Sequence, residues 1–414
     1  MEVLITHGWS EQNTGDYAIE NSIMNVIEDA SEESVNFKFY SLFDRKDRRL
    51  LEHNSLKLQK PNVGLIPSFW GTPPIQYSQW RKVIYILFCF IQFLCIRFFL
   101  IFGILIDKRL QKFKAADLVV VKGGTFIYTV PGLRGVIFGL RILFPIMLAV
   151  SMKRKIIIAP HSFGPFQNKW IDPLIFKYLK KLDHVYCREN ESVDILKKHG
   201  VQKCSFLPDM AFYNVGFEKK KTSSTIKIGI TARPLKFLIK EQNNTYRNYI
   251  SALVDYMEKT KNRFPRSSFF LIPQVIGPDP REDDTISLDE IYQSLNPSTQ
   301  KDTEILEGKL REPKELIEIY SQLDLLVGTR MHSVIFGLLS AVKPIAVSYL
   351  GPKHSGIMKS FNLEEYVTDI RNIKSSYLFD KTQKLLNTDI SSNLKMKSLE
   401  YKNRIYMEFK NKIA

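Results

Sequence analysis

The sequence predicts an α/β protein made of two domains, each built around a parallel β-sheet. Short β-rich runs alternate with helical patterns along most of the chain, and a polar run near the middle separates two such series. A length of 414 residues also exceeds what one small core supports. Together these observations predict two Rossmann-like domains facing a cleft.

The first series is predicted to form an N-terminal domain over residues 1–212. Its strand candidates are apolar runs, each followed by a loop rich in Gly, Pro or small polar residues. They are VLIT (3–6), LVVVK (118–122), KIIIAP (155–160), HVYCR (184–188) and SFLP (205–208).

The second series is predicted to form a C-terminal domain over residues 226–385. Residues 213–225, YNVGFEKKKTSST, lose the apolar pattern and are predicted to be the linker. The polar, helical stretch 386–414 is expected to pack back on the N-terminal domain. The strand candidates of this domain are IKIGIT (226–231), SFFLIP (268–273), DLLVGT (324–329) and PIAVSY (344–349).

Two long apolar runs in the N-terminal domain, 83–106 and 136–150, are flanked by basic residues. The first is long enough to span a bilayer, but Arg97 lies inside it, and a charge at mid-membrane costs about 2.5–3.5 kcal/mol. A second interpretation is a helix buried in the core. We expect the third, in which both helices lie on the membrane face with their basic flanks on anionic headgroups.

The charge of the chain is concentrated around these runs. Lys and Arg total 59 against 43 Asp and Glu, a net charge of +16, and residues 81–155 hold 13 basic and 2 acidic residues, a net of +11. This placement favours an anionic membrane surface over nucleic acid, because the basic residues are interleaved with aliphatic runs rather than spread over a polar groove. The four scattered cysteines and the absence of a signal-peptide pattern predict a cytoplasmic protein, peripherally associated with the inner face of the cell membrane.

Ligands of parallel sheets bind at the carboxyl ends of the strands, so the loops there are the first candidates for a site. In the N-terminal domain, Asp16 follows the first strand and is expected to cap a helix or to face the cleft. Gly123 and Gly124 follow a buried strand and allow a tight turn or close approach to a ligand. His161 follows the next strand directly and is either a loop histidine or a site residue.

The strongest candidate site follows the strand DLLVG in the C-terminal domain. Thr329, just after Gly328, is expected to cap a helix whose positive N-terminus favours an anion. Arg330 adds a bidentate donor, and His332 can exchange a proton near neutral pH. Arg233 and Lys353, each in a loop after another strand of this domain, are further candidate anion ligands.

Other site types lack sequence support. The chain has no phosphate-binding loop, nucleophile elbow or zinc-protease motif, and no metal site or cofactor is predicted. The pair Asp283-Asp284 is predicted to lie in a charged solvent loop rather than to hold a cation.

These motifs, in this order, resemble the polysaccharide pyruvyl transferase family over most of the chain. The family's opening pattern is similar to NTGDYAIENSIMNVI (13–27), and GTRMHSVIFGLLSAVKPIAVSY followed by Lys353 (328–353) is similar to its most specific segment. The apolar runs 83–106 and 136–150 are where the chain departs from the family. Further matching segments are the strand with its two glycines (118–124), SFGPF (162–166), RENESVDILKKHGV (188–201) and LPDMAF (207–212).

The resemblance implies a fold similar to the GT-B glycosyltransferases and the transfer of an enolpyruvyl unit from phosphoenolpyruvate to two hydroxyls of one sugar. A pyruvate ketal forms and phosphate leaves, in the synthesis of a bacterial capsule, exopolysaccharide or cell-wall polymer. The implied partners are phosphoenolpyruvate and a glycan acceptor, expected to be lipid-linked. His332 would be the acid, Arg233, Gly328, Thr329, Arg330 and Lys353 would bind the donor, and Asp16, Gly123, Gly124 and His161 would bind the acceptor.

Two other functions remain open at this stage. A GT-B glycosyltransferase with a nucleotide-sugar donor would use the same cations for a diphosphate. A membrane-bound binding protein without catalytic activity would release no phosphate from the donor in the presence of a lipid-linked acceptor.

Overall fold

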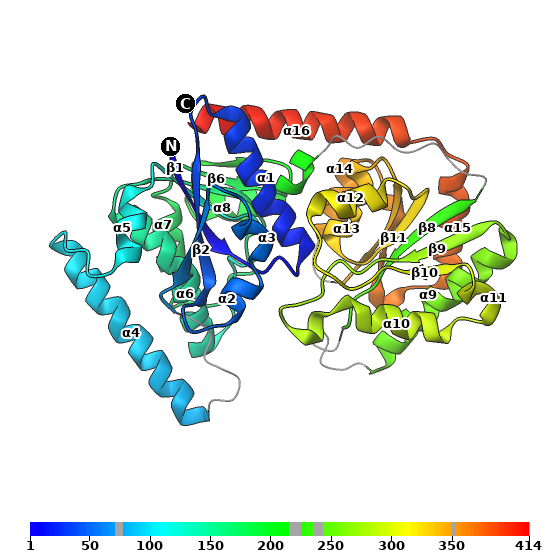
Figure 1. Cartoon of the computed structure of the whole chain (residues 1–414), viewed down its shortest axis with the longest axis horizontal. Helices are drawn as coiled ribbons and strands as arrows, with labels where there is room; N and C mark the ends of the chain where they lie inside the picture. The colour runs from blue at the N-terminus through cyan, green and yellow to red at the C-terminus, as the bar shows by residue number, and fades with distance from the viewer. Residues whose placement is uncertain (71–77, 215–224, 236–242, 350–352, 414) are drawn as a thin grey trace. The chain divides into compact units, whose positions relative to one another are not determined.

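The chain folds into two compact units, each containing a parallel β-sheet (Figure 1). The computed structural model describes residues 1–70, 78–214, 225–235, 243–349 and 353–413. The first unit comprises Met1–Glu11, Ile19–Met210 and Ile405–Ala414, and the second comprises Gln12–Ala18 and Ala211–Arg404. The predicted class, two parallel-sheet α/β domains, is confirmed. Most of the predicted linker, residues 215–224, lies outside the described residues.

The described part of the first unit contains a seven-stranded parallel sheet in the order β3-β2-β1-β4-β5-β6-β7. All four residues of β4 are buried, because helices cover both faces of such a sheet and leave no polar side. The strands β2 and β3 were not predicted. The strands are β1 (Glu2–Gly8), β2 (Asn36–Asp44), β3 (Val63–Ser68), β4 (Leu118–Val121), β5 (Lys155–His161), β6 (His184–Cys187) and β7 (Cys204–Phe206).

The helices of this part of the chain alternate with those strands, as a parallel sheet requires. Helix α1 begins in the second unit and continues in the first. The helices are α1 (Thr14–Ala30), α2 (Arg49–Glu52), α3 (Ser55–Leu58), α4 (Gln79–Ile101), α5 (Lys108–Ala115), α6 (Gly132–Ser151), α7 (Asp172–Leu179) and α8 (Asn190–Lys198).

Helix α6 is largely a core helix, which corrects the expectation that 136–150 faces a membrane. Residues 142–149 are all buried in the core of the first unit. The charge of Arg141 is accommodated because its guanidinium donates a hydrogen bond to the carbonyl of Leu42 at 2.6 Å. Since residues 142–149 pack inside the unit, they cannot contact lipid.

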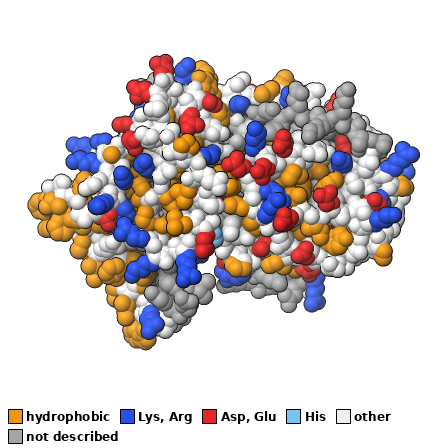
Figure 2. Space-filling view, in the orientation of Figure 1, with side chains coloured by type: hydrophobic (Ala, Val, Ile, Leu, Met, Phe, Trp, Pro, Cys, Tyr) orange, Lys and Arg blue, Asp and Glu red, His pale blue; other side chains and the backbone are white. Residues whose placement is uncertain are grey.

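Helix α4 is largely exposed, so the core interpretation of 83–106 is wrong. Only 12% of the apolar segment within Val83–Ile101 is buried, whereas 56% of the corresponding segment within Gly132–Ser151 of α6 is buried. By length and composition alone, Val83–Ile101 and Gly132–Ser151 are each apolar enough to cross a membrane. Figure 2 shows hydrophobic side chains along the lower left edge, where Figure 1 draws α4.

The described part of the second unit contains a six-stranded parallel sheet in the order β10-β9-β8-β11-β12-β13. The strands β8, β11 and β12 are neighbours in it, so the loops that follow them emerge at one edge. The strands are β8 (Ile226–Thr231), β9 (Ser267–Leu271), β10 (Thr303–Ile305), β11 (Leu325–Gly328), β12 (Lys343–Ser348) and β13 (Val367–Asp369). The α-helices are α9 (Asn243–Arg263), α10 (Asp284–Ser294), α11 (Pro297–Gln300), α12 (Pro313–Tyr320), α13 (Met331–Leu339), α14 (Lys353–Ser360), α15 (Ser375–Leu386) and α16 (Ser391–Ile413). The 3₁₀ helices are η1 (Met210–Asn214), η2 (Pro280–Glu282), η3 (Glu364–Tyr366) and η4 (Ile370–Asn372).

Helix α16 belongs to both units. Its first half packs in the second unit, where Tyr401 meets Phe212 edge to face at 5.2 Å between ring centroids. Its last turns are counted in the first unit, where Glu408 accepts a 3.0 Å hydrogen bond from the hydroxyl of Tyr186. The segment predicted to pack on the N-terminal domain therefore does so from Ile405 onward.

Candidate functional site

The carboxyl edge of the second sheet carries two cations that the sequence singled out. Arg233 follows β8 and Arg330 follows β11, the strand beside it. The guanidinium of Arg233 lies 4.4 Å from the ring centroid of Tyr349, the residue after β12. The parallel register of three neighbouring strands thus brings these residues to one edge.

Arg233 is buried but only weakly paired. Its side chain is 6% exposed, and its Nη2 lies 3.6 Å from Glu282 Oε1, beyond hydrogen-bond distance. Its buried Nε has no hydrogen-bond partner among the described residues. A buried guanidinium donor without a partner is costly, so this atom is suited to an anionic ligand.

Arg330, in contrast, is already paired. Its Nη2 lies 2.6 Å from Asp284 Oδ1, its Nε lies 3.0 Å from the same oxygen, and Nη2 also donates to the carbonyl of Glu282. Burial by itself would lower the pKa of this guanidinium, but Asp284 raises it above its ordinary value. Arg330 is therefore fixed in orientation rather than free to clamp a ligand with its whole guanidinium.

The prediction of a solvent loop at Asp283-Asp284 is wrong for Asp284. This carboxylate is completely buried and accepts hydrogen bonds from the backbone N–H groups of Gln274 and Val275 at 3.1 and 2.9 Å. Burial raises the pKa of Asp284, and Arg330 and the two N–H groups partly oppose that rise. Asp283 caps α10 by accepting from the N–H of Thr285 at 3.0 Å. Asp284 thus organises the site, although no local sequence signal separates it from Asp283.

Thr329 and Gly328 are structural parts of this edge. Arg330, not Thr329, is the N-cap residue of α13, and the Thr329 hydroxyl bonds that of Tyr249 at 2.8 Å. A Cβ on Gly328 would lie 2.9 Å from the hydroxyl of Ser333, so glycine allows the close approach of β11 and α13. The expected helix cap at Thr329 is therefore corrected.

His332 lies in the first turn of α13, in direct contact with the opening motif of the chain. Residues Gln12–Ala18 belong to the second unit, where Asn13 and Val275 form an antiparallel bridge. A Cβ on Gly15 would lie only 2.2 Å from His332 Nδ1. The segments that bear the first and the last sequence motifs thus meet at a half-buried histidine.

Asp16 is in the same segment but is not the N-cap of α1. The cap is Asn13, whose Oδ1 accepts from the backbone N–H of Asp16 at 3.2 Å. The carboxylate of Asp16 accepts from Asn13 Nδ2 at 2.7 Å and is half-buried. It directly follows Gly15, the residue that contacts His332.

Lys353 is the first residue of α14, and its side chain lies outside the described residues. The next residue, His354, is buried, and its Nε2 donates to the carbonyl of Thr329 at 3.2 Å. This bond brings the start of α14 to the end of β11, the edge that carries Arg330. The role of Lys353 stays a prediction.

The candidates in the first unit are packing residues. His161 is fully buried, and its Nε2 accepts the N–H of Ile127 at 3.1 Å, so the placement contradicts a surface-loop base. A Cβ on Gly123 would lie 2.6 Å from the carbonyl of Pro160, and Gly124 has a φ of +145°. These glycines permit the join between β4 and β5, which the sequence alone could not distinguish from a ligand site.

A buried ion cluster at the carboxyl ends of β1 and β4 was not anticipated. Glu20 is paired with Lys57, and its Oε1 lies 3.6 Å from Lys122 Nζ. Glu20 also accepts the N–H of Trp9, the residue after β1, at 2.8 Å. The cluster therefore fixes the start of the loop that leads into the opening motif.

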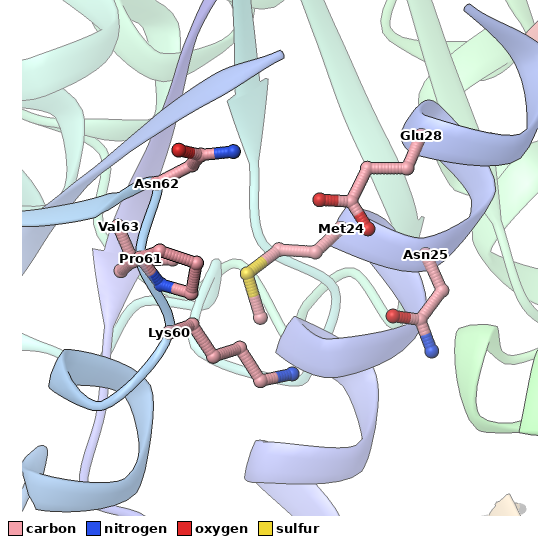
Figure 3. A pocket seen from close by; sticks show the side chains of 7 residues that line it. All are labelled: Met24, Asn25, Glu28, Lys60, Pro61, Asn62 and Val63. Carbon is pink, nitrogen blue, oxygen red and sulfur yellow. The ribbon is translucent and has the colours of Figure 1, made fainter. Parts of the chain in front are cut away.

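A surface hollow of about 230 Å³ lies at the opposite end of the first sheet (Figure 3). It lies beside the start of β3 and holds none of the residues singled out as site candidates, so it is not a candidate for the reaction. It is lined by Met24, Asn25, Glu28, Lys60, Pro61, Asn62 and Val63. Among the described residues, no group of three or more His, Cys, Asp or Glu side chains is placed to hold a metal ion.

The sequence of the chain is similar to those of known proteins. The polysaccharide pyruvyl transferase family matches residues 13–351. The amylovoran biosynthesis protein AmsJ of Erwinia amylovora is 22% identical over 292 residues, 67% of each chain.

Solved structures are similar in fold alone. UDP-GlcNAc 2-epimerase of Methanocaldococcus jannaschii has a TM-score of 0.55 at 11% identity, with 94% of both chains covered. α,α-Trehalose 6-phosphate synthase of Burkholderia multivorans has a TM-score of 0.52 at 10% identity, with 100% of this chain and 94% of that chain covered. These neighbours confirm the predicted GT-B-like fold. The family match spans most of the residues, and the chain belongs to the polysaccharide pyruvyl transferase family.

Proposed function

We propose that this transferase moves the enolpyruvyl unit of phosphoenolpyruvate onto two hydroxyls of one sugar in a lipid-linked glycan. The product is a pyruvate ketal, and phosphate is released. The observation that carries the proposal is the contact of Gly15 with His332, at the start of α13 and on the edge that bears Arg233 and Arg330.

The donor needs fixed positive charge, because phosphoenolpyruvate carries both a phosphate and a carboxylate. Arg233 is the principal ligand in this proposal, since its Nε is buried without a hydrogen-bond partner among the described residues. Arg330 is held by Asp284 and offers the remaining Nη1, and the N-terminus of α13 adds its partial positive charge. Lys353 is the third cation proposed for the donor.

The chemistry assigned to His332 is that of a general acid. Its imidazolium gives a proton to the methylene carbon of the enol, and an oxocarbenium-like centre forms at the neighbouring carbon. One sugar hydroxyl bonds to that carbon and loses its proton, which restores the acid. The bond to the phosphate oxygen breaks, the second hydroxyl closes the ketal, and its proton leaves with phosphate. No step of this reaction requires a metal or another cofactor.

For the acceptor side, Asp16 is the residue retained. Its carboxylate lies next to Gly15 and is half-buried, which suits a hydrogen bond to a sugar hydroxyl. His161 is not part of the proposed acceptor site, because its ring is buried and already accepts a backbone hydrogen bond.

A nucleotide-sugar glycosyltransferase is the second candidate, favoured by the fold it would share with the UDP-GlcNAc 2-epimerase structure. A thermal-shift panel separates the two. We expect phosphoenolpyruvate to stabilise the protein and nucleotide sugars to have no effect. Stabilisation by nucleotide sugars alone would favour glycosyl transfer.

Replacing Arg233 with alanine is expected to weaken phosphoenolpyruvate binding about 10- to 100-fold, because a hydrogen bond to a charged group contributes about 1.5–3 kcal/mol. Calorimetric titration measures the affinity. Arg281→Ala is the matched control, since Arg281 lies in η2 beside Glu282 and is 60% exposed. Wild-type affinity in Arg233→Ala would remove Arg233 from the donor site.

Replacing Gly15 with alanine is expected to lower turnover about 100-fold, because a methyl group 2.2 Å from Nδ1 would displace His332 by more than the chemistry tolerates. The rate of phosphate release measures the effect. In the control Gly8→Ala, the new methyl would meet its nearest neighbour at an ordinary 3.5 Å. Equal turnover of the two variants would show that the position of His332 is unimportant.

A further inference from the structure

The outer surface of α4 is a continuous apolar face. Its exposed side chains recur at helical spacings of three and four residues, so they lie along one side of the helix. Soluble monomers rarely expose large contiguous apolar patches without a function. The residues are Ile84, Leu87, Phe88, Ile91, Leu94, Phe98 and Ile101, and they are 50–76% exposed.

The opposite side of α4 is attached to the first unit. Ile96 is 1% exposed, and the ring of Phe93 packs at a tilt against Trp70 and Phe144, at 5.7 and 5.5 Å between ring centroids. Cys89 and Leu100 extend this contact stripe in both directions. The helix is therefore attached to the first unit from Cys89 to Leu100, and its apolar outer face is presented to the surroundings.

Basic side chains border both ends of this face. Arg81 is exposed at the start of α4. Lys108, Lys112 and Lys114 are exposed on α5, after the apolar segment 102–106. Not every base between 81 and 155 contributes, because Lys122 is buried, and Arg141 is half-buried with its guanidinium bonded to the carbonyl of Leu42. Figure 2 shows basic side chains beside the hydrophobic edge in the region of α4.

We propose that α4 and α5 form a monotopic membrane-binding surface. The outer face of α4 enters one leaflet of an anionic bilayer, with the helix parallel to the membrane plane, and the lysines of α5 contact anionic headgroups. Trp80, 78% exposed at the start of α4, lies at the level of the headgroups, where tryptophan is enriched.

The charges favour lipid over a second copy of the chain. A symmetric dimer through α4 would place Lys108, Lys112 and Lys114 beside the same lysines of the second copy if the helices were parallel, and beside its Arg81 if they were antiparallel. Like charges oppose both contacts. Anionic headgroups neutralise the same lysines. A spanning orientation is disfavoured because crossing the bilayer would separate Phe93 and Ile96 from the unit that they pack on.

Vesicle flotation of the full chain tests the proposal. The protein is mixed with vesicles of phosphatidylglycerol and phosphatidylcholine, or of phosphatidylcholine alone, without any substrate. We expect the wild type to float with the anionic vesicles and much less with the neutral ones. Because no turnover is measured, this result does not depend on the proposed reaction.

Two variants identify the surface. Phe88→Ser/Ile91→Ser/Phe98→Ser is expected to stay at the bottom of the gradient, while Leu51→Ser/Trp170→Ser, which removes side chains of similar exposure elsewhere on the first unit, floats like the wild type. Lys108→Gln/Lys112→Gln/Lys114→Gln is expected to bind anionic vesicles about 100-fold more weakly, because each lysine near an anionic surface contributes to the free energy of binding and the three contributions add. Circular dichroism checks that each variant folds.

Several outcomes would overturn the proposal. One is failure of the wild type to float with anionic vesicles. Another is flotation of the Phe88/Ile91/Phe98 variant at the level of the wild type. Retention in vesicles after alkaline carbonate washing would indicate a spanning helix. A lipid-free dimer that the same substitutions dissociate would assign the face to a second copy of the chain.

Discussion

Replacing His332 with alanine is expected to lower phosphate release from phosphoenolpyruvate in the presence of acceptor by about 100- to 10,000-fold, the usual contribution of a positioned general acid. Binding of the donor should change little, because the cations assigned to it are Arg233, Arg330 and Lys353. A coupled phosphate assay measures the rate, and a thermal shift with phosphoenolpyruvate confirms donor binding.

His199→Ala is the matched control for this substitution. His199 is an exposed histidine at the end of α8 in the first unit, and its ring stacks on Phe176 at 3.9 Å. We expect the control to keep wild-type turnover. Full turnover in His332→Ala would remove His332 from the mechanism and leave its contact with Gly15 as packing alone.

Replacing Asp284 with alanine is expected to lower the free energy of unfolding of the second unit by about 3–5 kcal/mol. The substitution leaves the Arg330 guanidinium buried without its counter-ion. It also removes the acceptor of the Gln274 and Val275 N–H groups. Urea denaturation, followed by a signal from the second unit, measures the loss.

The neighbouring carboxylate provides the comparison. Asp283→Ala removes only a helix cap and is expected to cost about 1 kcal/mol. The double variant Asp284→Ala/Arg330→Ala should lose less stability than the sum of the two single variants, because the pair is removed together. If Asp284→Ala were no more destabilised than Asp283→Ala, the buried ion pair would not be what holds this edge together.

The fold was largely predictable because each strand of a parallel sheet has a recognisable pattern in the local sequence. Buried strands such as Leu118–Val121 are continuous apolar runs, and each ends in a loop with turn residues. The strand β2 was not predicted although it is nine residues long, because polar residues interrupt its apolar run. Its neighbour β3 was not predicted because its apolar run is short. The exposed α4 and the largely buried α6 could not be distinguished, because both are uniformly apolar and only packing separates them.

The site was predictable only where residues follow adjacent strands. Arg233 and Arg330 reach one edge because β8 and β11 pair in parallel, a consequence of the fold class itself. The partner of Arg330 was missed, because Asp284 is 46 residues away and no periodicity links them. The burial of His161 was missed for the same reason, since its partner Ile127 comes from another loop.

The contact of the opening motif with His332 was also beyond sequence patterns. Asn13 forms an antiparallel β-bridge with Val275, a residue far away in the sequence. This bridge places Gly15 against His332. What local sequence did supply was the residue types: a glycine where no Cβ fits, and a histidine at the start of a helix. Tertiary packing then decides that the two belong to one site.

The most direct test of pyruvyl transfer is the mass of the product. The full chain is incubated with phosphoenolpyruvate and a panel of lipid-linked or synthetic glycosides, and the acceptors are analysed by mass spectrometry. Ketal formation predicts that one acceptor gains the mass of pyruvic acid less one water, with one phosphate released per product. No gain with phosphoenolpyruvate, together with the gain of a sugar unit when nucleotide sugars are supplied, would contradict the proposed function.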